Sequence, residues 1–142
     1  MKKDGVLNAR LMEKISGLGH FDSFVICDMG FPVPKDAAVV DLALVRGIPG
    51  FMQTLKAILG EVVVQEIILM DAVKEANSLL NEQISEIFKQ QEIKYKSFDE
   101  FRNIGNDAKF FVRTAEDAPC SNMILISASG VMERVEKYRI DF

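Results

Sequence analysis

Hydrophobic positions along this chain alternate between helical and strand spacing. Leucine and isoleucine at positions 7, 11, 15 and 18 recur at helical spacing, Asn8 can cap this first helix, and glycines at positions 17 and 19 mark its end. Further helices are predicted at residues 51–59 and 76–89, and a capping box formed by Ser97 and Glu100 predicts another short helix. Apolar runs predict strands at residues 24–27, 39–42, 62–70, 110–114 and 123–127, and alternating polarity predicts another at residues 93–96.

This alternation of helices and strands predicts an α/β fold. We expect a three-layer α/β/α architecture, with a mostly parallel central sheet and helices on both faces. The 142 residues fit one domain that spans residues 1–142. Ligands of such sheets bind at the carboxyl ends of the strands, where Asp28 and the loop after Thr114 lie. The charged stretch 133–139 could extend a strand, form a helical turn or hang free.

The charge and hydropathy of the chain indicate which kinds of partner it is not expected to bind. The net charge is −4, the pI is near 5.1, and the lysines and arginines are scattered, so we expect no nucleic-acid partner. The longest uncharged run, residues 118–132, is shorter than the roughly 18 apolar residues of a membrane span. The N-terminus lacks the apolar region of a signal peptide. We therefore expect a soluble, cytoplasmic protein without a membrane partner.

The cysteines and the single histidine give no metal-binding pattern. Cys27 and Cys120 lie far apart and neither belongs to a CxxC pair, which favours a reducing compartment and no disulfide. One histidine with two separated cysteines has no zinc-type spacing. Phosphate-binding glycine loops and the G-x-S-x-G motif are also absent from the sequence. We expect no metal and no cofactor.

The histidine itself, His20, is the first candidate for acid-base chemistry. Among side chains, only histidine has an unperturbed pKa that places its charge change between about pH 5 and 8. Asp28 closes the strand that follows His20. A carboxylate in that position could fix the tautomer of the histidine or hold a substrate.

Each candidate also has a plainer structural interpretation. His20 could cap the preceding helix, and Asp28 could be a turn residue that bonds its own backbone. Arg113 and Glu116 are expected to form an ion pair or a subunit contact rather than to act in catalysis. Cys120 has no neighbour in the sequence that would lower the pKa of its thiol, so it is not expected to be a nucleophile.

Several short motifs occur in a recognisable order and spacing. They are Leu18-Gly19-His20-Phe21-Asp22, Asp28-Met29-Gly30-Phe31-Pro32-Val33-Pro34, Asp41-Leu42-Ala43-Leu44, Gly47-Ile48-Pro49, Arg113-Thr114 with Glu116, and Asn122 before the last apolar run. With the Lys-Asp-Gly-Val-Leu-Asn start, they resemble the D-ribose pyranase family, the ribose branch of the ribose pyranase and fucose mutarotase group. The resemblance covers residues 5–127.

What the resemblance implies is a cofactor-free sugar mutase. Such an enzyme interconverts the pyranose and furanose ring forms of D-ribose or a related monosaccharide. The catalytic histidine of the family falls on His20, which would be the general acid/base, and the substrate-binding aspartate falls on Asp28. Asn122, in the position of the family's Tyr-x-Asn motif, would contact the sugar. The resemblance also implies a homo-oligomer, a pentameric ring or a decamer, whose pocket is completed by a neighbouring subunit.

Two predicted sugar-binding positions depart from the family pattern. Phe98 stands where the family has a second histidine, and Cys120 stands where it has the tyrosine of Tyr-x-Asn. Phe98 cannot form a hydrogen bond to a hydroxyl, and an unmatched buried polar group costs about 1 to 3 kcal/mol. Two alternatives therefore stay open: an accessory or sensing subunit that binds a sugar or sugar phosphate without turnover, and a fucose-type mutarotase. Residues 129–142 form a C-terminal extension relative to the family.

Overall fold

The computed structural model describes residues 1–131. The expectations for the stretch 133–139, and for all but the first three residues of the extension 129–142, lie outside the described residues. The helices in the described part are α1 (Ala9–Ser16), α2 (Phe51–Leu59), α3 (Val73–Ala76), α4 (Ser78–Ile87) and α5 (Phe98–Gly105). The strands are β1 (Ser23–Cys27), β2 (Val39–Asp41), β3 (Val64–Met70), β4 (Glu92–Lys96), β5 (Phe111–Arg113) and β6 (Met123–Ser127).

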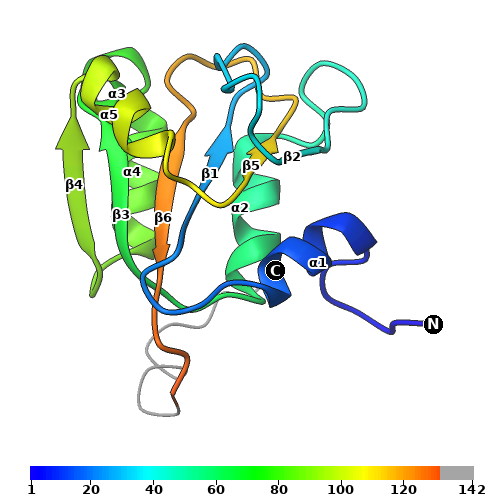
Figure 1. The fold of residues 1–142 in the computed structure, drawn as a ribbon. Coiled ribbons are helices and arrows are strands. Elements are labelled where there is room, and N and C mark those ends of the chain that lie inside the picture. The colour runs from blue at the N-terminus through cyan, green and yellow to red at the C-terminus, as the bar shows by residue number, and fades with distance from the viewer. Residues whose placement is uncertain (132–142) are drawn as a thin grey trace.

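These strands form one sheet with the order β2-β5-β1-β6-β3-β4. Strand β1 pairs parallel to β5, β5 parallel to β2, and β3 parallel to β4. Strand β6 lies between β1 and β3 and runs antiparallel to both (Figure 1). The other five strands therefore share one direction. We call the end where they finish the carboxyl end of the sheet and the opposite end its amino end.

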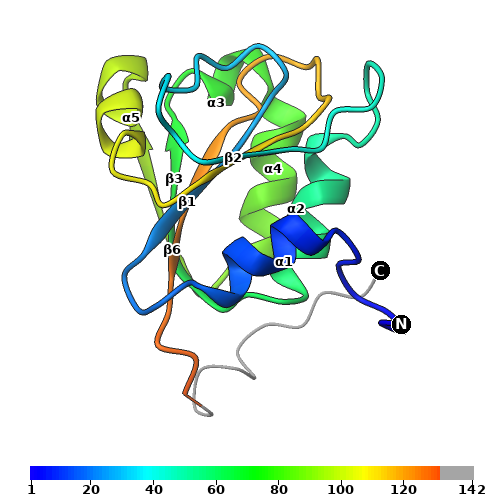
Figure 2. The same cartoon turned by 45° about the vertical axis from the view of Figure 1, so that its right-hand side comes forward.

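Helices cover both faces of this sheet. Helices α1, α2 and α4 lie on one face and α5 lies on the other (Figure 2). The predicted three-layer α/β/α architecture with a mostly parallel sheet is thus confirmed. The strand boundaries differ from the prediction by one or two residues, since short strands end where their ladder hydrogen bonds end.

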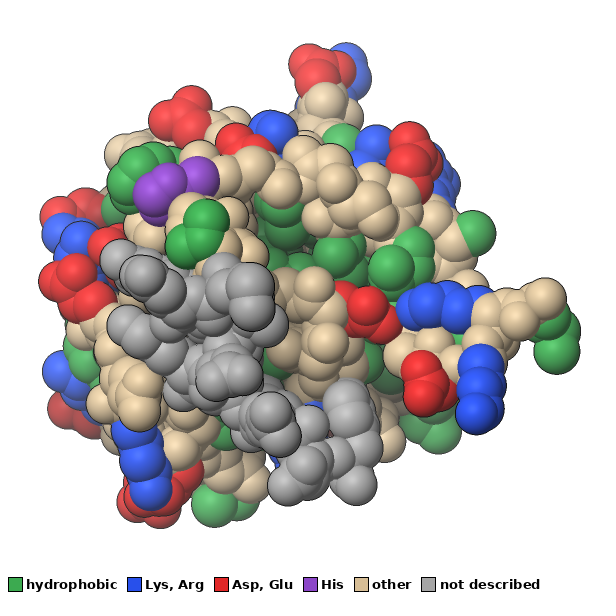
Figure 3. Space-filling view, turned by 90° about the horizontal axis from the view of Figure 1, so that it is seen from below, with side chains coloured by type: hydrophobic (Ala, Val, Ile, Leu, Met, Phe, Trp, Pro, Cys, Tyr) green, Lys and Arg blue, Asp and Glu red, His purple; other side chains and the backbone are tan. Residues whose placement is uncertain are grey.

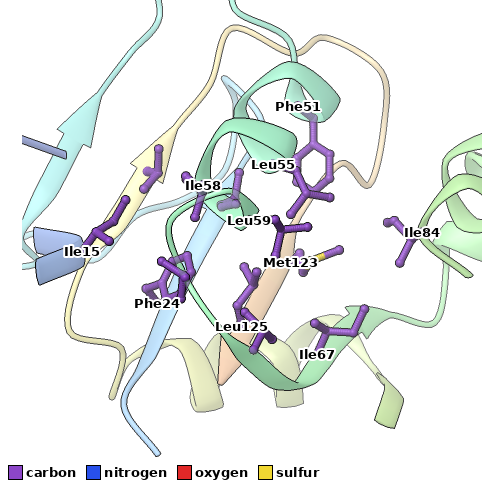
Figure 4. Close-up of a cluster of buried hydrophobic side chains, with 14 of the residues drawn as sticks. Ile15, Phe24, Phe51, Leu55, Ile58, Leu59, Ile67, Ile84, Met123 and Leu125 are labelled. Atoms are coloured by element: carbon purple, nitrogen blue, oxygen red, sulfur yellow. The ribbon is translucent and has the colours of Figure 1, made fainter. Parts of the chain in front are cut away.

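The larger core fills the space between the sheet and α1, α2 and α4. Apolar side chains at helical spacing on α2 meet alternate residues of the strands (Figure 4). Those labelled in Figure 4 are Ile15, Phe24, Phe51, Leu55, Ile58, Leu59, Ile67, Ile84, Met123 and Leu125. Leu7 is the exception to the predicted apolar stripe of the first helix, because it precedes the helix cap and its side chain is exposed.

Side-chain caps define where several helices begin. The Asn8 side chain accepts the Leu11 N–H, and Ser97 and Glu100 form the predicted capping box of α5. The prediction of one continuous helix over residues 76–89 is wrong at its start, because the helical conformation is interrupted at Asn77. Asn77 leaves the helical conformation (φ −150°, ψ 62°), and its side chain accepts the Leu80 N–H to start α4.

The smaller core holds α5 against the second face. Phe101 is fully buried there, with its ring centroid 5.8 Å from that of Phe31 in the loop after β1. Phe98, on the same helix, is 46% exposed. Phe101 is therefore the large side chain of α5 that is fully buried against the sheet, and Ile104 packs beside it.

We expect Phe101→Ala to lower the free energy of unfolding by about 3 to 5 kcal/mol, because it removes a fully buried ring and leaves a cavity. Urea denaturation followed by circular dichroism measures the change. The matched control is Phe98→Ala, for which we expect a change within about 0.5 kcal/mol. Equal losses in the two variants would contradict this account of how α5 is held.

Candidate functional site

Two of the predicted site residues meet at the carboxyl end of the sheet. Asp28 follows β1 and Asn122 precedes β6, and the antiparallel pairing of the two strands places these residues side by side. The Asn122 side chain accepts the Asp28 N–H at 2.9 Å through Oδ1 and donates through Nδ2 to the Asp28 carboxylate at 2.7 Å. Asn122 is only 3% exposed. Both ends of its amide are used, so Asn122 holds the Asp28 carboxylate in one orientation.

The second carboxylate oxygen of Asp28 shapes the loop that follows. It accepts the Gly30 N–H at 3.0 Å, which is the turn-forming bond expected of an aspartate in this position. The interpretation of Asp28 as a turn residue is therefore confirmed. The same carboxylate remains partly exposed at the carboxyl end of the sheet, so a role in the turn and a role toward a ligand are compatible.

Cys120 lies two residues before Asn122 in a loop with unusual geometry. Its φ of 57° is in the left-handed region, and the loop is held by Asn77, whose side-chain amide donates to the Pro119 carbonyl at 3.0 Å and to the Ser121 hydroxyl at 3.3 Å. Burial, and then the nearby carboxylates of Asp28 and Asp71, raise the pKa of the Cys120 thiol. The thiol is thus protonated at neutral pH, as expected for a cysteine that is not a nucleophile.

Phe98 lies at the same end of the sheet but farther along it. It begins α5 directly after β4, and β4 is separated from β1 by β6 and β3, so the two strands are roughly 14 Å apart. The Arg102 guanidinium lies 5.6 Å from the centroid of the Phe98 ring. The structure therefore brings Asp28, Cys120 and Asn122 together and places Phe98 on the neighbouring side of the same end.

His20 lies at the amino end of the sheet, on the face seen from below in Figure 3, where it is the purple side chain. Five residues of β1, roughly 16 Å of extended chain, lie between the two ends. The expectation that Asp28 could fix the tautomer of His20 is therefore wrong within one chain. The two residues flank the same strand in the sequence, and an extended strand carries its flanking residues apart.

The imidazole of His20 contacts two neighbours at this end. Its Nε2 lies 3.0 Å from Oε1 of Gln65, and its ring stacks on that of Phe21 with centroids 3.7 Å apart. The interpretation of His20 as a helix cap is wrong, because the N–H of Gly17 bonds the last carbonyls of α1 instead. Gln65 was not predicted as a site residue.

A network of polar contacts fixes the loop that carries His20. The Ser127 hydroxyl, at the end of β6, donates to the carbonyls of Gly19 and Asp22. The Asp22 carboxylate accepts the Gly19 N–H and pairs with Lys109. The bond from Lys109, followed by that from Gly19, lowers the pKa of Asp22. The loop is thus tied to β6 on one side and to the segment before β5 on the other.

Arg113 and Glu116 do not pair with each other, so the predicted ion pair is wrong. The Arg113 guanidinium donates to Asp41 at 2.7 Å across the β2–β5 pairing, and this bond keeps the pKa of Asp41 below its usual value. The Glu116 carboxylate instead accepts the Phe51 N–H at the start of α2. Both side chains have structural partners that are distant in the sequence.

The thiols of Cys27 and Cys120 are free, and burial raises the pKa of Cys27 to about 12. Within residues 1–131, no three His, Cys, Asp or Glu side chains gather closely enough to hold a metal ion. No helix in that range is long and apolar enough to cross a membrane.

A family model described as the RbsD / FucU transport protein family matches residues 1–132. The chain belongs to this family. A D-ribose pyranase from Petrotoga mobilis is 44% identical over 128 residues, covering 89% of this chain and 97% of the relative. A D-ribose pyranase from Actinobacillus pleuropneumoniae serotype 7 is 43% identical over 135 residues, with the same coverage of each chain.

Two solved structures have the same fold. Bacillus subtilis RbsD complexed with D-ribose aligns with a TM-score of 0.87 at 38% identity, over 90% of this chain and 98% of that one. The fucose mutarotase of Streptococcus pneumoniae in complex with L-fucose aligns with a TM-score of 0.72 at 21% identity, over 88% of this chain and 95% of that one. The second likeness is one of fold.

The bond pattern at Asp28 makes Asn122 important for stability. Asn122→Leu leaves the Asp28 N–H and carboxylate without their partner, so we expect the free energy of unfolding to fall by about 1 to 3 kcal/mol. Urea denaturation measures the loss. Asn103→Leu on the exposed side of α5 is the control, and a loss as large as that of the Asn122 variant would show that Asn122 holds nothing in place.

Proposed function

We propose that this chain is a D-ribose pyranase, a cofactor-free enzyme that interconverts the pyranose and furanose forms of D-ribose, with His20 as general acid/base. The observation that carries the proposal is the likeness to RbsD complexed with D-ribose, at a TM-score of 0.87 and 38% identity over nearly the full length of both chains. The relatives named as D-ribose pyranases support the same activity. The lower identity to the fucose mutarotase favours ribose over fucose as substrate.

The reaction breaks one C–O bond and forms another, and the groups that assist it need only accept and donate protons. In the pyranose, C1 carries the hydroxyl oxygen O1 and the ring oxygen O5. A base takes the proton from O1, the C1–O5 bond breaks as a C1=O1 double bond forms, and O5 receives a proton. Closure to the furanose then joins O4 to C1, while O4 loses its proton and O1 regains one. No proton is gained or lost overall, so a group that accepts and returns a proton supports each step.

The carboxyl end of the sheet supplies rigid groups that could hold the sugar. The Asp28 carboxylate, oriented by Asn122 and Gly30, is a strong acceptor for hydroxyl groups. Cys120 and Phe98, at the same end, offer a protonated thiol and an apolar ring. We propose that these residues contact the sugar, with Asp28 making the strongest bond.

Catalysis by His20 on a sugar held by Asp28 requires two copies of the chain. The two residues lie at opposite ends of β1, too far apart to reach one monosaccharide. We propose a homo-oligomer, such as a pentameric ring or a decamer, in which His20 of one subunit faces Asp28 of another. Exposed apolar side chains support association, among them Phe21 beside His20 and Leu44, Val45 and Ile48 in the loop before α2.

A second candidate function follows from Phe98 and the thiol of Cys120. A pocket lined by a phenyl ring offers no hydrogen bond to one of the sugar hydroxyls, which lowers affinity for ribose. An accessory subunit that binds a sugar or sugar phosphate without turnover would tolerate this change. We further propose a cytoplasmic location, because the free thiols of Cys27 and Cys120 suit a reducing compartment.

Magnetisation exchange by NMR between the pyranose and furanose signals of D-ribose tests the activity. We expect the protein to accelerate the exchange and His20→Ala to lower the acceleration by about 100-fold or more, the usual contribution of a general acid/base. Asp36→Ala, an exposed position, is the control. Full activity of His20→Ala would refute the acid/base role, and ribose binding without any acceleration would favour the accessory subunit. A panel of other pentoses and hexoses identifies the preferred sugar.

Mixed oligomers test whether the site is shared between subunits. His20→Ala and Asp28→Ala should each be inactive alone, whereas coexpressed variants should recover about one quarter of the wild-type rate, because random mixing restores that share of sites. Differently tagged variants allow mixed oligomers to be purified before the assay. Mixed oligomers that remain inactive would contradict a site built from two subunits.

A further inference from the structure

The amino end of the sheet holds a second polar side chain against His20. Given the role of His20 proposed above, we propose that Gln65 is a positioning residue, which keeps the His20 proton on Nε2 and leaves Nδ1 as the nitrogen that exchanges protons with the sugar. The proposal rests on the contact between the two side chains, on the irregularity in β3 that produces it, and on the chemistry of an amide acceptor.

A β-bulge aims Gln65 at the histidine. In the pairing of β3 with β6, Val64 lies opposite Ser127 and Glu66 lies opposite Ile126, so two steps along β3 match one step along β6. Gln65 is the additional residue. Bulges of this kind turn a side chain away from its regular direction, and they are frequent beside active sites.

The distribution of β3 side chains between the two cores shows the same irregularity. Val64, Ile67 and Leu69 pack in the larger core, whereas Ile68 and Met70 pack in the smaller core. Val64 and Ile67 share a face although they are three residues apart, which a regular strand with a period of two does not allow. The additional residue, Gln65, therefore lies between Val64 and Ile67, and its side chain does not follow the regular alternation between the two faces.

The ring of His20 is fixed on more than one side. Phe21 adopts a φ of 67°, an uncommon conformation for a bulky residue, and this turn stacks its ring on the imidazole with an interplanar angle of 16°. The Ser127 hydroxyl bonds the carbonyl of Gly19 immediately before the histidine. With the loop and one ring face held in this way, the bond to Gln65 sets the rotation of the imidazole.

The bond to Gln65 also assigns the two ring nitrogens. Oε1 of Gln65 is an acceptor, so the Nε2 that lies 3.0 Å from it carries a proton. Nδ1 has no hydrogen-bond partner among residues 1–131, and the side chain is exposed. In the neutral ring, the lone pair that can take a proton from a sugar hydroxyl is therefore on Nδ1.

An amide suits this position because the proton moves on and off the ring during each turnover. The Nε2–H can donate to Oε1 whether Nδ1 is protonated or not, so the contact persists through the reaction. A neutral amide also adds no charge that would hold the ring in its protonated form. The nearby carboxylates have other partners: Asp22 pairs with Lys109, and Glu66 pairs with Lys94 at 2.8 Å.

The chain has one histidine, so the imidazole signals of isotope-labelled protein belong to His20 alone. We expect ¹⁵N shifts of the neutral wild-type ring to show the proton on Nε2. Gln65→Leu removes the acceptor at similar size, and we expect both tautomers to appear and kcat to fall about two- to tenfold at little change in KM, the loss of one ordinary hydrogen bond. Gln65→Glu keeps an acceptor, so it should keep the Nε2 proton and a higher kcat than the leucine variant.

Gln83→Leu, at an exposed position on α4, is the matched control and should change neither signal nor rate. A wild-type ring protonated on Nδ1, or a Gln65→Leu variant with the wild-type tautomer and kcat, would overturn the role of Gln65. Failure of the proposed function is a different result, since the wild-type protein would then not accelerate the exchange, or His20→Ala would keep the full rate, whatever the tautomer. The tautomer is read in the folded wild-type protein, so it does not depend on the stability of any variant.

Discussion

The reversal of β6 in the middle of the sheet determines the contacts of both Asn122 and the loop that carries His20. Because β6 runs against β1 and β3, its first residues meet the end of β1 and its last residues meet the beginning of β1 and β3. Asn122, before the strand, therefore reaches Asp28, whereas Ser127, at its end, holds the loop of His20. A parallel β6 would remove both contacts at once. One strand thus organises two chemically different ends of the molecule.

Most of the fold could be predicted from local patterns. Helices α1 and α5 begin where the sequence places a cap, and each strand coincides with an apolar or alternating run, because burial of one or two faces imposes a period that is visible in the residues. Asn77 shows the limit of this reasoning. Its interruption between α3 and α4 depends on its bonds to Pro119 and Ser121, which are more than forty residues away. Local propensity carries no information on such partners.

The site was less predictable than the fold for the same reason. His20 and Asp28 are eight residues apart in the sequence, and only knowledge that β1 is fully extended between them shows that they cannot act on one sugar within a chain. The partner of Arg113 is Asp41 on a neighbouring strand and not the nearby Glu116. The bulge at Gln65 is only weakly visible in the sequence, as a shift in the alternation of the apolar residues of β3 between the two faces of the strand. This shift can be recognised only once it is known which residues of β3 face which side of the sheet.

The separation of the two ends also separates two chemical tasks. Under the proposed function, hydroxyl groups are recognised at the carboxyl end, where Phe98 and Cys120 lie, and His20 transfers protons at the amino end. The Asp28–Asn122 bonds and the contacts of His20 share no residue. Under the same proposal, a substitution at Phe98 alters which sugar is held without disturbing the imidazole. Because the reaction needs only one proton acceptor and donor of constant geometry, the amino end can remain unchanged while substrate preference varies at the other end.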